Sequence, residues 1–88
     1  MIRRRVVVHG RVQGVGFRYE ARDRARSLGL GGFITNLPDG TVEGAFEGPE
    51  EKVESMIDWC RRGPSGAQVV DLEVEWEDPR GEMGFWVT

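Results

Sequence analysis

The segment from Val70 to Glu77 alternates strictly between apolar and acidic side chains. Successive side chains of a strand point to opposite faces of a sheet, so this pattern predicts a strand with one buried face and one face in water. Burial on one face only is typical of antiparallel sheets, and the buried face then needs a covering layer. The rest of the chain must therefore supply a covering layer, and helices packed on one side of the sheet fit this requirement.

Two segments have the periodicity of such helices. In the first, apolar residues recur at helical spacing over about a dozen residues from Phe17, with charged residues between them. Gly29 follows as the residue type that ends helices in a left-handed conformation. In the second, Pro49 suits the first helical position and Gly63 marks the end. The apolar stripe of the second helix consists of Val53, Met56, Ile57 and Cys60.

Four other segments predict strands: residues 3–9, 31–36, 41–47 and the short stretch 85–87. The Pro-Asp-Gly turn at 38–40 joins the second and third of these into a hairpin. The order is therefore β-α-β-β-α-β with a short extra strand. We predict an α+β fold of the ferredoxin-like (split βαβ) type: an antiparallel sheet with two helices on one face, in a single domain over residues 1–88.

The composition excludes several classes of protein. No apolar run approaches the roughly 18 residues that a membrane span needs. The basic start of the chain precedes only three valines, too few for the apolar core of a signal peptide, so we expect a cytoplasmic protein. Cys60 is the only cysteine and His9 the only histidine; both are expected to be structural. No cluster has metal-ligand spacing, so no metal or other cofactor is expected.

Charge is distributed unevenly along the chain. Residues 1–36 contain eight arginines and two acidic residues, a balance of +6, whereas residues 37–88 contain four basic and thirteen acidic residues, a balance of -9. The two balances sum to the net charge of -3. This asymmetry favours a local site for a small anion and argues against a polyanion that covers the surface.

A glycine-rich segment between the first strand and the first helix is the clearest candidate for such a site. Gly10, Gly14 and Gly16 permit backbone conformations in which successive N–H groups point into one concavity that binds an anion. Arg18 follows in the first helical turn, where a cation opposes the helix dipole unless an anion binds there. Three glycines by themselves favour the alternative, an ordinary strand-to-helix turn with an exposed arginine. The spacing matches neither a Walker A loop nor a dinucleotide-binding loop.

Chain geometry brings Asn36 to the same place. A helix of roughly 12 residues runs about 18 Å away from the loop, and the following strand returns about 17 Å. Asn36 ends that strand, so its side chain lies at the level of Arg18. An amide offers a donor and an acceptor without charge, which suits the orientation of a water molecule beside a phosphate. The alternative is that Asn36 only opens the turn, and the sequence leaves both possibilities open.

These segments resemble the two signatures of the acylphosphatase family, and the resemblance extends over nearly the whole chain. The second signature departs from the family at Phe33, Ile34 and Thr35. The matching residues are Gly10-x-Val12-Gln13-Gly14-Val15-x-Phe17-Arg18 in the first signature, and Gly32-Phe33-Ile34-Thr35-Asn36 with Gly40-Thr41-Val42 and Gly48 in the second.

The resemblance implies hydrolysis of acyl phosphates to a carboxylate and inorganic phosphate, without a metal and without a covalent phosphoenzyme. It implies that Arg18 and the loop amides hold the phosphate, that Asn36 positions the attacking water, and that inorganic phosphate competes with the substrate. A monomer is expected, with neither nucleic acid nor membrane as partner. The residues expected to bind phosphate through backbone amides are Gln13, Gly14, Val15, Gly16, Phe17 and Arg18.

Two other functions fit the same topology. RNA-recognition domains share it, and Arg3 to Arg5 together with sheet aromatics would be the evidence for RNA binding. The acidic net charge and the absence of a basic-aromatic motif at residues 42–47 count against that reading. The second alternative is a module that binds phosphate or carbamoyl phosphate without turnover, as part of a larger maturation enzyme.

Overall fold

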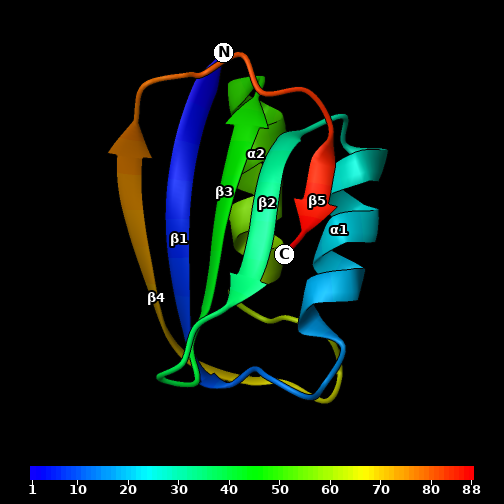
Figure 1. Cartoon of the computed structure of the whole chain (residues 1–88), viewed down its shortest axis with the longest axis vertical. Coiled ribbons are helices and arrows are strands. Elements are labelled where there is room, and N and C mark those ends of the chain that lie inside the picture. Colours follow the sequence, from blue (N-terminus) through cyan, green and yellow to red (C-terminus); the bar gives the residue numbers. More distant parts are fainter.

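The alternating strands and helices assemble into one five-stranded sheet with both helices packed on the same face (Figure 1). The computed structural model describes all of residues 1–88. Neither of its helices has the length and apolar character needed to cross a membrane. The elements are β1 (Ile2–Arg11), α1 (Phe17–Ser27), β2 (Gly31–Asn36), β3 (Val42–Gly48), α2 (Glu50–Cys60), β4 (Gln68–Glu77) and β5 (Phe85–Val87).

The strand order in the sheet is β4-β1-β3-β2-β5. The first four strands in this order pair antiparallel, as expected, whereas β5 pairs parallel with β2. The predicted α+β, split βαβ fold with a short extra strand is therefore confirmed, and the extra strand makes the sheet mixed. Because β1 and β2 are both antiparallel to β3, they run in the same direction, and their carboxyl ends lie at the same end of the sheet.

The hydrophobic core lies between the sheet and the two helices. Phe17 at the start of α1 meets the ring of Trp59 edge-on, with 5.2 Å between the ring centroids, and so joins the two helices. Cys60 is fully buried in this core, and burial raises the pKa of its thiol to about 12. The largest core side chains from the sheet are Phe46, Phe85 and Ile34, followed by valines that include Val6, Val8 and Val42.

The first strand is longer than the sequence pattern predicts. The prediction ended it at residue 9 and placed Gly10 in the loop, but β1 continues to Arg11 through a bulge between His9 and Gly10. Gly10 has a φ of 126°, and a Cβ atom there would lie 2.0 Å from the carbonyl oxygen of Gln68. The glycine is therefore required by the close approach of β4, a contact between distant residues that local sequence does not reveal.

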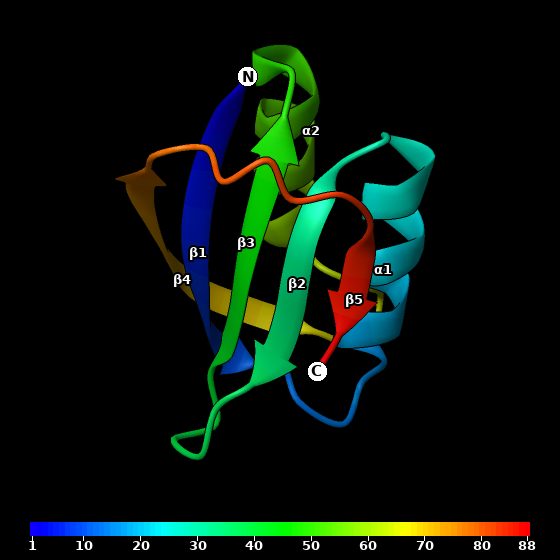
Figure 2. The same cartoon turned by 45° about the horizontal axis from the view of Figure 1, so that its top comes forward.

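The connection from β4 to β5 crosses the face of the sheet that the helices leave open (Figure 2). Beneath it Arg3 is only 1% exposed, and its guanidinium pairs with Glu47 at 3.1 Å, Glu77 at 2.9 Å and Glu82 at 2.8 Å. The Glu47 carboxylate also accepts three consecutive backbone N–H groups, of residues 80–82, at 2.7 to 3.2 Å. This buried cluster attaches the connection to the sheet and so places β5 beside β2.

The apolar face of β4 is less buried than its alternation predicts. Leu72 is half-buried, but Val70 is 77% and Trp76 is 80% exposed. The reason is position: β4 is an edge strand, and α2 packs on β1 and β3 in the middle of the sheet. The Trp76 ring lies instead under the guanidinium of Arg4, at 4.0 Å from the ring centroid.

Candidate active site

A cavity of about 100 Å³ opens where β1 and β2 end. The loop after β1, the first residues of α1 and the last residue of β2 surround it. Two groups that are 18 positions apart in the sequence, Arg18 and Asn36, therefore share one cavity with the glycine loop, as the chain geometry predicts. The lining residues are Val12, Gly14, Gly16, Phe17, Arg18, Tyr19 and Asn36.

The glycine loop presents backbone donors that no other backbone group uses. Gly14 and Gly16 have φ values of 75° and 81°, in the left-handed region that favours glycine. The N–H groups of residues 13–16 donate no hydrogen bond to another backbone group. Gly16 is also the N-cap residue that directly precedes α1, so the free N–H groups of the first helical turn continue the series. Together these donors form a concavity suited to an anion.

Arg18 is held at the cavity by the end of β5. Its Nη1 donates to the Thr88 carbonyl oxygen at 3.1 Å, and its guanidinium lies 5.7 Å from the centroid of the Tyr19 ring. The same carbonyl oxygen accepts a hydrogen bond from the Thr35 hydroxyl at 3.1 Å, while the Thr88 N–H donates to Ile34 at 2.9 Å. Sequence reasoning missed Thr35 and Thr88 as supports of Arg18, because a contact over 70 positions leaves no local pattern.

Asn36 is distinguished by an unsatisfied atom. Its Oδ1 is buried and has no hydrogen-bond partner, which is costly by about 1–3 kcal/mol for a neutral polar group. If Asn36 served only to open the turn, its side chain would be expected to bond to the turn backbone. Asp39 does that instead: its Oδ1 accepts the Thr41 N–H at 3.0 Å and the Thr41 hydroxyl at 2.6 Å. The Asn36 acceptor is thus left without a partner in a residue that lines the cavity.

Two of the predicted loop residues do not line the cavity. The Gln13 side chain turns towards the hairpin that follows Asn36, where its amide donates to the carbonyl oxygens of Leu37 and Thr41. Val15 packs against the hydrophobic core and lies next to Gly66 in the connection before β4. Only their backbone N–H groups remain available for an anion. Sequence reasoning assigned Gln13 to the loop but did not detect the function of its side chain.

The charge around the cavity favours an anion. Arg18 is the only charged residue that lines it, and no acidic side chain does. No group of three or more His, Cys, Asp or Glu side chains comes together in a way that could hold a metal ion. The single histidine, His9, pairs with Glu73 on the open face of the sheet, in the neighbouring strand. A phosphate group in the cavity would meet a cation and free N–H donors, and no acidic side chain is among the lining residues.

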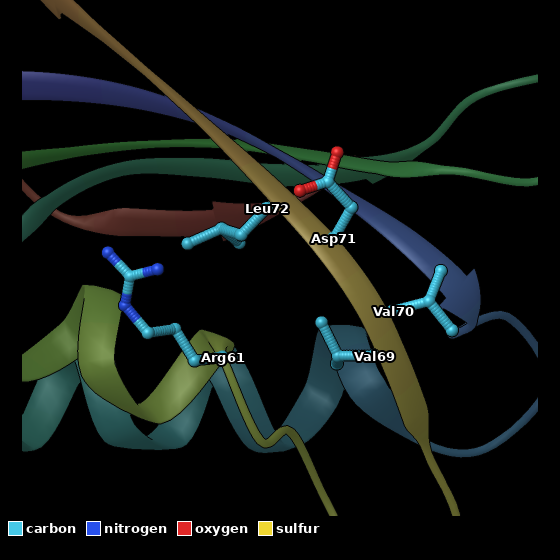
Figure 3. Close-up of a pocket in the computed structure, with 5 residues that line it drawn as sticks. All are labelled: Arg61, Val69, Val70, Asp71 and Leu72. Carbon is cyan, nitrogen blue, oxygen red and sulfur yellow. The ribbon is translucent and has the colours of Figure 1, made fainter.

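A second hollow lacks these features. It has a volume of about 260 Å³ and lies between the end of α2 and the start of β4 (Figure 3). Arg61 reaches towards Leu72 across it, whereas Asp71 projects from β4 in a different direction. The hollow contains no predicted site residue and no glycine-rich loop. The cavity at Arg18 is therefore the better candidate for chemistry.

Comparison with known proteins identifies the family of the chain. The family model described as Acylphosphatase matches residues 4–87. The chain is 55% identical over 87 residues to an acylphosphatase from Nostoc sp., covering 99% of this chain and 86% of that protein. It is 50% identical over 86 residues to an acylphosphatase from Thermococcus kodakarensis, covering 98% and 94% of the two chains.

A solved structure gives the same answer for the fold. The crystal structure of acylphosphatase from Bacillus subtilis matches with a TM-score of 0.96 at 36% identity, over 100% of this chain and 99% of that one. The family model, the curated relatives and the solved structure agree, and the chain belongs to the acylphosphatase family.

Proposed function

We propose that this chain hydrolyses acyl phosphates, the mixed anhydrides of a carboxylic acid and phosphoric acid, without a metal ion. Hydrolase chemistry on acid anhydrides follows from membership of the family. One observation supports the assignment of the site: Asn36, whose Oδ1 has no hydrogen-bond partner, lines the same cavity as Arg18 and the glycine loop. The cavity thus combines an anion-binding surface with a free acceptor for water.

The phosphate is bound by the backbone N–H groups of residues 13–18 and by Arg18. Free N–H groups and the positive end of a helix dipole favour negative charge at the start of α1. The guanidinium contributes two N–H groups in a planar arrangement that matches two phosphate oxygens. The Thr88 carbonyl oxygen occupies one donor of Arg18 and fixes the side chain, and the other donors remain for the substrate.

Asn36 orients the attacking water. Its Oδ1 accepts a hydrogen bond from one O–H of the water, whose hydrogen stays on the attacking oxygen, and this contact directs a lone pair of the water oxygen at phosphorus. A new P–O bond forms from water, and the bond between phosphorus and the acyl oxygen breaks with its electron pair leaving on the carboxylate. The second water proton passes to a non-bridging oxygen of the phosphate itself. The products are one carboxylate and one inorganic phosphate.

This reaction needs neither a protein acid nor a protein base. A carboxylic acid has a pKa of about 4, so a carboxylate leaves at neutral pH without being protonated. Phosphoryl transfer depends chiefly on positioning and on stabilisation of charge. The absence of a histidine or carboxylate from the cavity lining is therefore consistent with the proposed mechanism.

The open face of the sheet does not support RNA binding. Arg3 and Arg5, which suggested it in the sequence, are paired there with glutamates: Arg3 with Glu47, and Arg5 with Glu77 at 2.7 Å. These glutamates neutralise the arginines and leave no basic surface for a phosphate backbone. We further infer that the protein acts in the cytoplasm as a monomer in one domain over residues 1–88, with a small acyl phosphate as substrate.

The direct test is an assay with benzoyl phosphate in the presence of EDTA. Hydrolysis is expected to proceed at an unchanged rate when EDTA is added, and inorganic phosphate is expected to inhibit competitively. Activity that depends on added Mg²⁺ would contradict the metal-free mechanism. Phosphate binding without turnover would favour the alternative of a non-catalytic module.

Two substitutions test the assigned residues. Arg18→Ala and Asn36→Ala are each expected to lower kcat by about 10²–10³-fold, the typical cost of removing one preorganised charge-stabilising contact. Arg22→Ala is the matched control, because Arg22 lies on the same helix and its guanidinium pairs with Asp23 at 3.0 Å. It is expected to retain wild-type kcat. A folded Arg18→Ala protein with wild-type activity would exclude the proposed role of the guanidinium.

A further inference from the structure

The side chain of Gln13 joins the two halves of the candidate site. Its Nε2 donates to the Leu37 carbonyl oxygen at 2.8 Å and to the Thr41 carbonyl oxygen at 2.9 Å. Gln13 belongs to the loop after β1, and Leu37 directly follows Asn36 at the end of β2. No strand pairing joins these two segments, because β3 lies between β1 and β2 in the sheet.

Only the amide nitrogen of Gln13 fits this position. Both partners are backbone carbonyl oxygens, which accept hydrogen bonds and cannot donate them. The two N–H bonds of the amide therefore have to face them, and the orientation of the side chain is fixed by chemistry. Each carbonyl also accepts a bond within the turn, from Gly40 N–H to Leu37 and from Leu37 N–H to Thr41. Gln13 thus adds two hydrogen bonds to the turn between β2 and β3, although it lies in the loop after β1.

We propose that Gln13 is a positioning residue that sets where Asn36 holds water relative to the phosphate. This inference rests on the proposed function. Asn36 makes no hydrogen bond through its Oδ1, so its side chain is not fixed by a partner of its own. Its location depends on the backbone on either side of it, and Gln13 fixes the carbonyl of the next residue. The loop that carries the phosphate donors is thereby held at a set distance from the asparagine.

The loop itself depends less on this contact. It is attached directly to β1 on one side and to α1 on the other, and its shape follows from Gly14 and Gly16. Removal of the Gln13 amide should therefore move Asn36 more than it disturbs the phosphate-binding N–H groups. A shift of about 1 Å in a reacting group can lower a rate by about 10²-fold. The expected signature is a loss in kcat without an equal loss in phosphate affinity.

The test is Gln13→Met, which keeps the length of the side chain and removes both donors. We expect kcat for benzoyl phosphate to fall by about 10- to 100-fold. The dissociation constant of inorganic phosphate, measured by calorimetry, should change by less than about threefold. Gln68→Met is the matched control: Gln68 is the other glutamine of the chain, is exposed at the start of β4, and should tolerate the change with wild-type kcat and phosphate affinity.

A double-mutant cycle with Asn36→Ala shows whether Gln13 acts through Asn36. In the Asn36→Ala background, Gln13→Met should lower kcat by less than about threefold further, because the residue that it positions is gone. Two results would overturn the inference and leave the proposed function intact. The first is that Gln13→Met lowers kcat as much in the Asn36→Ala background as it does in the wild type. The second is that Gln13→Met alone weakens phosphate binding by the same factor by which it lowers kcat. If Asn36→Ala alone retained wild-type kcat, the proposed function would fail together with the inference.

Gln13→Glu provides the same test if the Met variant does not fold. A carboxylate has no donor for the two carbonyl oxygens, but a protonated carboxyl group has one. The kcat of this variant relative to wild type should therefore rise as the pH falls from about 8 to about 5, towards the range in which a glutamate binds its proton. A ratio that does not change with pH would contradict the inference.

Discussion

At the scale of single residues, Gly14 is required by its backbone conformation and not by a lack of space for a side chain. Its φ of 75° is in the left-handed region, yet a Cβ atom there would meet nothing within 4 Å. Gly81, in the connection before β5, has the same properties, with a φ of 71° and no neighbour within 4 Å. The two glycines therefore make a matched pair: one lines the cavity and the other does not.

We expect Gly14→Ala and Gly81→Ala to destabilise the protein by similar amounts, about 1–2 kcal/mol, because each forces an L-residue into the left-handed region. Only Gly14→Ala should weaken phosphate binding, by about tenfold, since hydrogen bonds to a charged group contribute about 1.5–3 kcal/mol. Chemical unfolding and phosphate titration measure the two effects. Equal phosphate affinity in both variants would show that the loop N–H groups do not hold the anion.

The sequence predicts part of this site. Arg18 and Asn36 could be brought together because a helix and a strand of known rise per residue join them. The contacts of Arg18 with Thr88 and of Gln13 with Leu37 could not, because they link residues that are 70 and 24 positions apart. Such contacts depend on how the whole sheet assembles, and no local pattern records them.

At the scale of elements, the connection from β4 to β5 depends on one buried carboxylate. Burial by itself raises the pKa of Glu47, but the hydrogen bonds from Arg80 N–H and the Arg3 guanidinium, with those from the next two N–H groups, outweigh it and hold the pKa below its usual value. The Arg3 hydrogen bond is the main cause of the lowered pKa of Glu77. Both carboxylates therefore stabilise the fold in their charged form.

Glu47→Gln is expected to lower the free energy of unfolding at neutral pH by about 2–3 kcal/mol, because it removes a charge from a buried hydrogen-bonded pair. Glu43→Gln is the control: Glu43 is on the same strand, but its pair with Arg5 is longer, 3.4 Å, and less buried, so the loss should stay below about 1 kcal/mol. Denaturant unfolding of the wild type and the two variants measures these free energies. Equal losses of stability in Glu47→Gln and Glu43→Gln would contradict the special role of Glu47.

The carboxylates of Glu47 and Glu77 also determine how the stability of the fold depends on pH. Because the folded pKa values of Glu47 and Glu77 are lowered, their stabilisation is fully present above the unfolded value of about 4.3 and is lost as the pH falls through the folded values. The wild type should therefore lose stability in acid more steeply than Glu47→Gln, and the two unfolding free energies should converge there.

Element by element, the sequence predicts the fold well where patterns are local. Both helices and the β2–β3 hairpin follow from periodicity and turn residues. The bulge at Gly10 and the parallel pairing of β5 could not be predicted, because the first depends on Gln68 and the second on the buried pair of Arg3 with Glu47. The exposure of Trp76 was missed for a related reason: alternation shows which face of a strand is apolar, but not that the strand lies at the edge.

At the scale of the whole molecule, the two edges of the sheet argue against self-association. The β5 edge is only three residues long. The β4 edge carries acidic residues at every second position, and antiparallel pairing of two β4 strands would bring these like charges together. The strand is well protected from edge pairing in spite of its exposed Trp76.

We therefore expect a monomer of 9.9 kDa in light-scattering measurements, over the concentration range used for assays. The double variant Glu73→Gln/Glu75→Gln removes two of the edge charges and should associate more readily than the wild type. A concentration-dependent dimer of the wild type would contradict the expectation, and a variant as monomeric as the wild type would show that charge is not what protects the edge.

The site is built on two strands that do not touch each other. Since β3 separates β1 from β2, the ends of these two strands lie two strand spacings apart, roughly 10 Å. The spacing of the strand ends is set by main-chain hydrogen bonds, which every amino acid except proline can provide, while Gln13 adds the side-chain contact between the loop and the turn after Asn36. The outward surfaces of both helices can therefore change almost without restriction while the reactive groups keep their separation, so the chemistry of this small protein tolerates extensive substitution elsewhere.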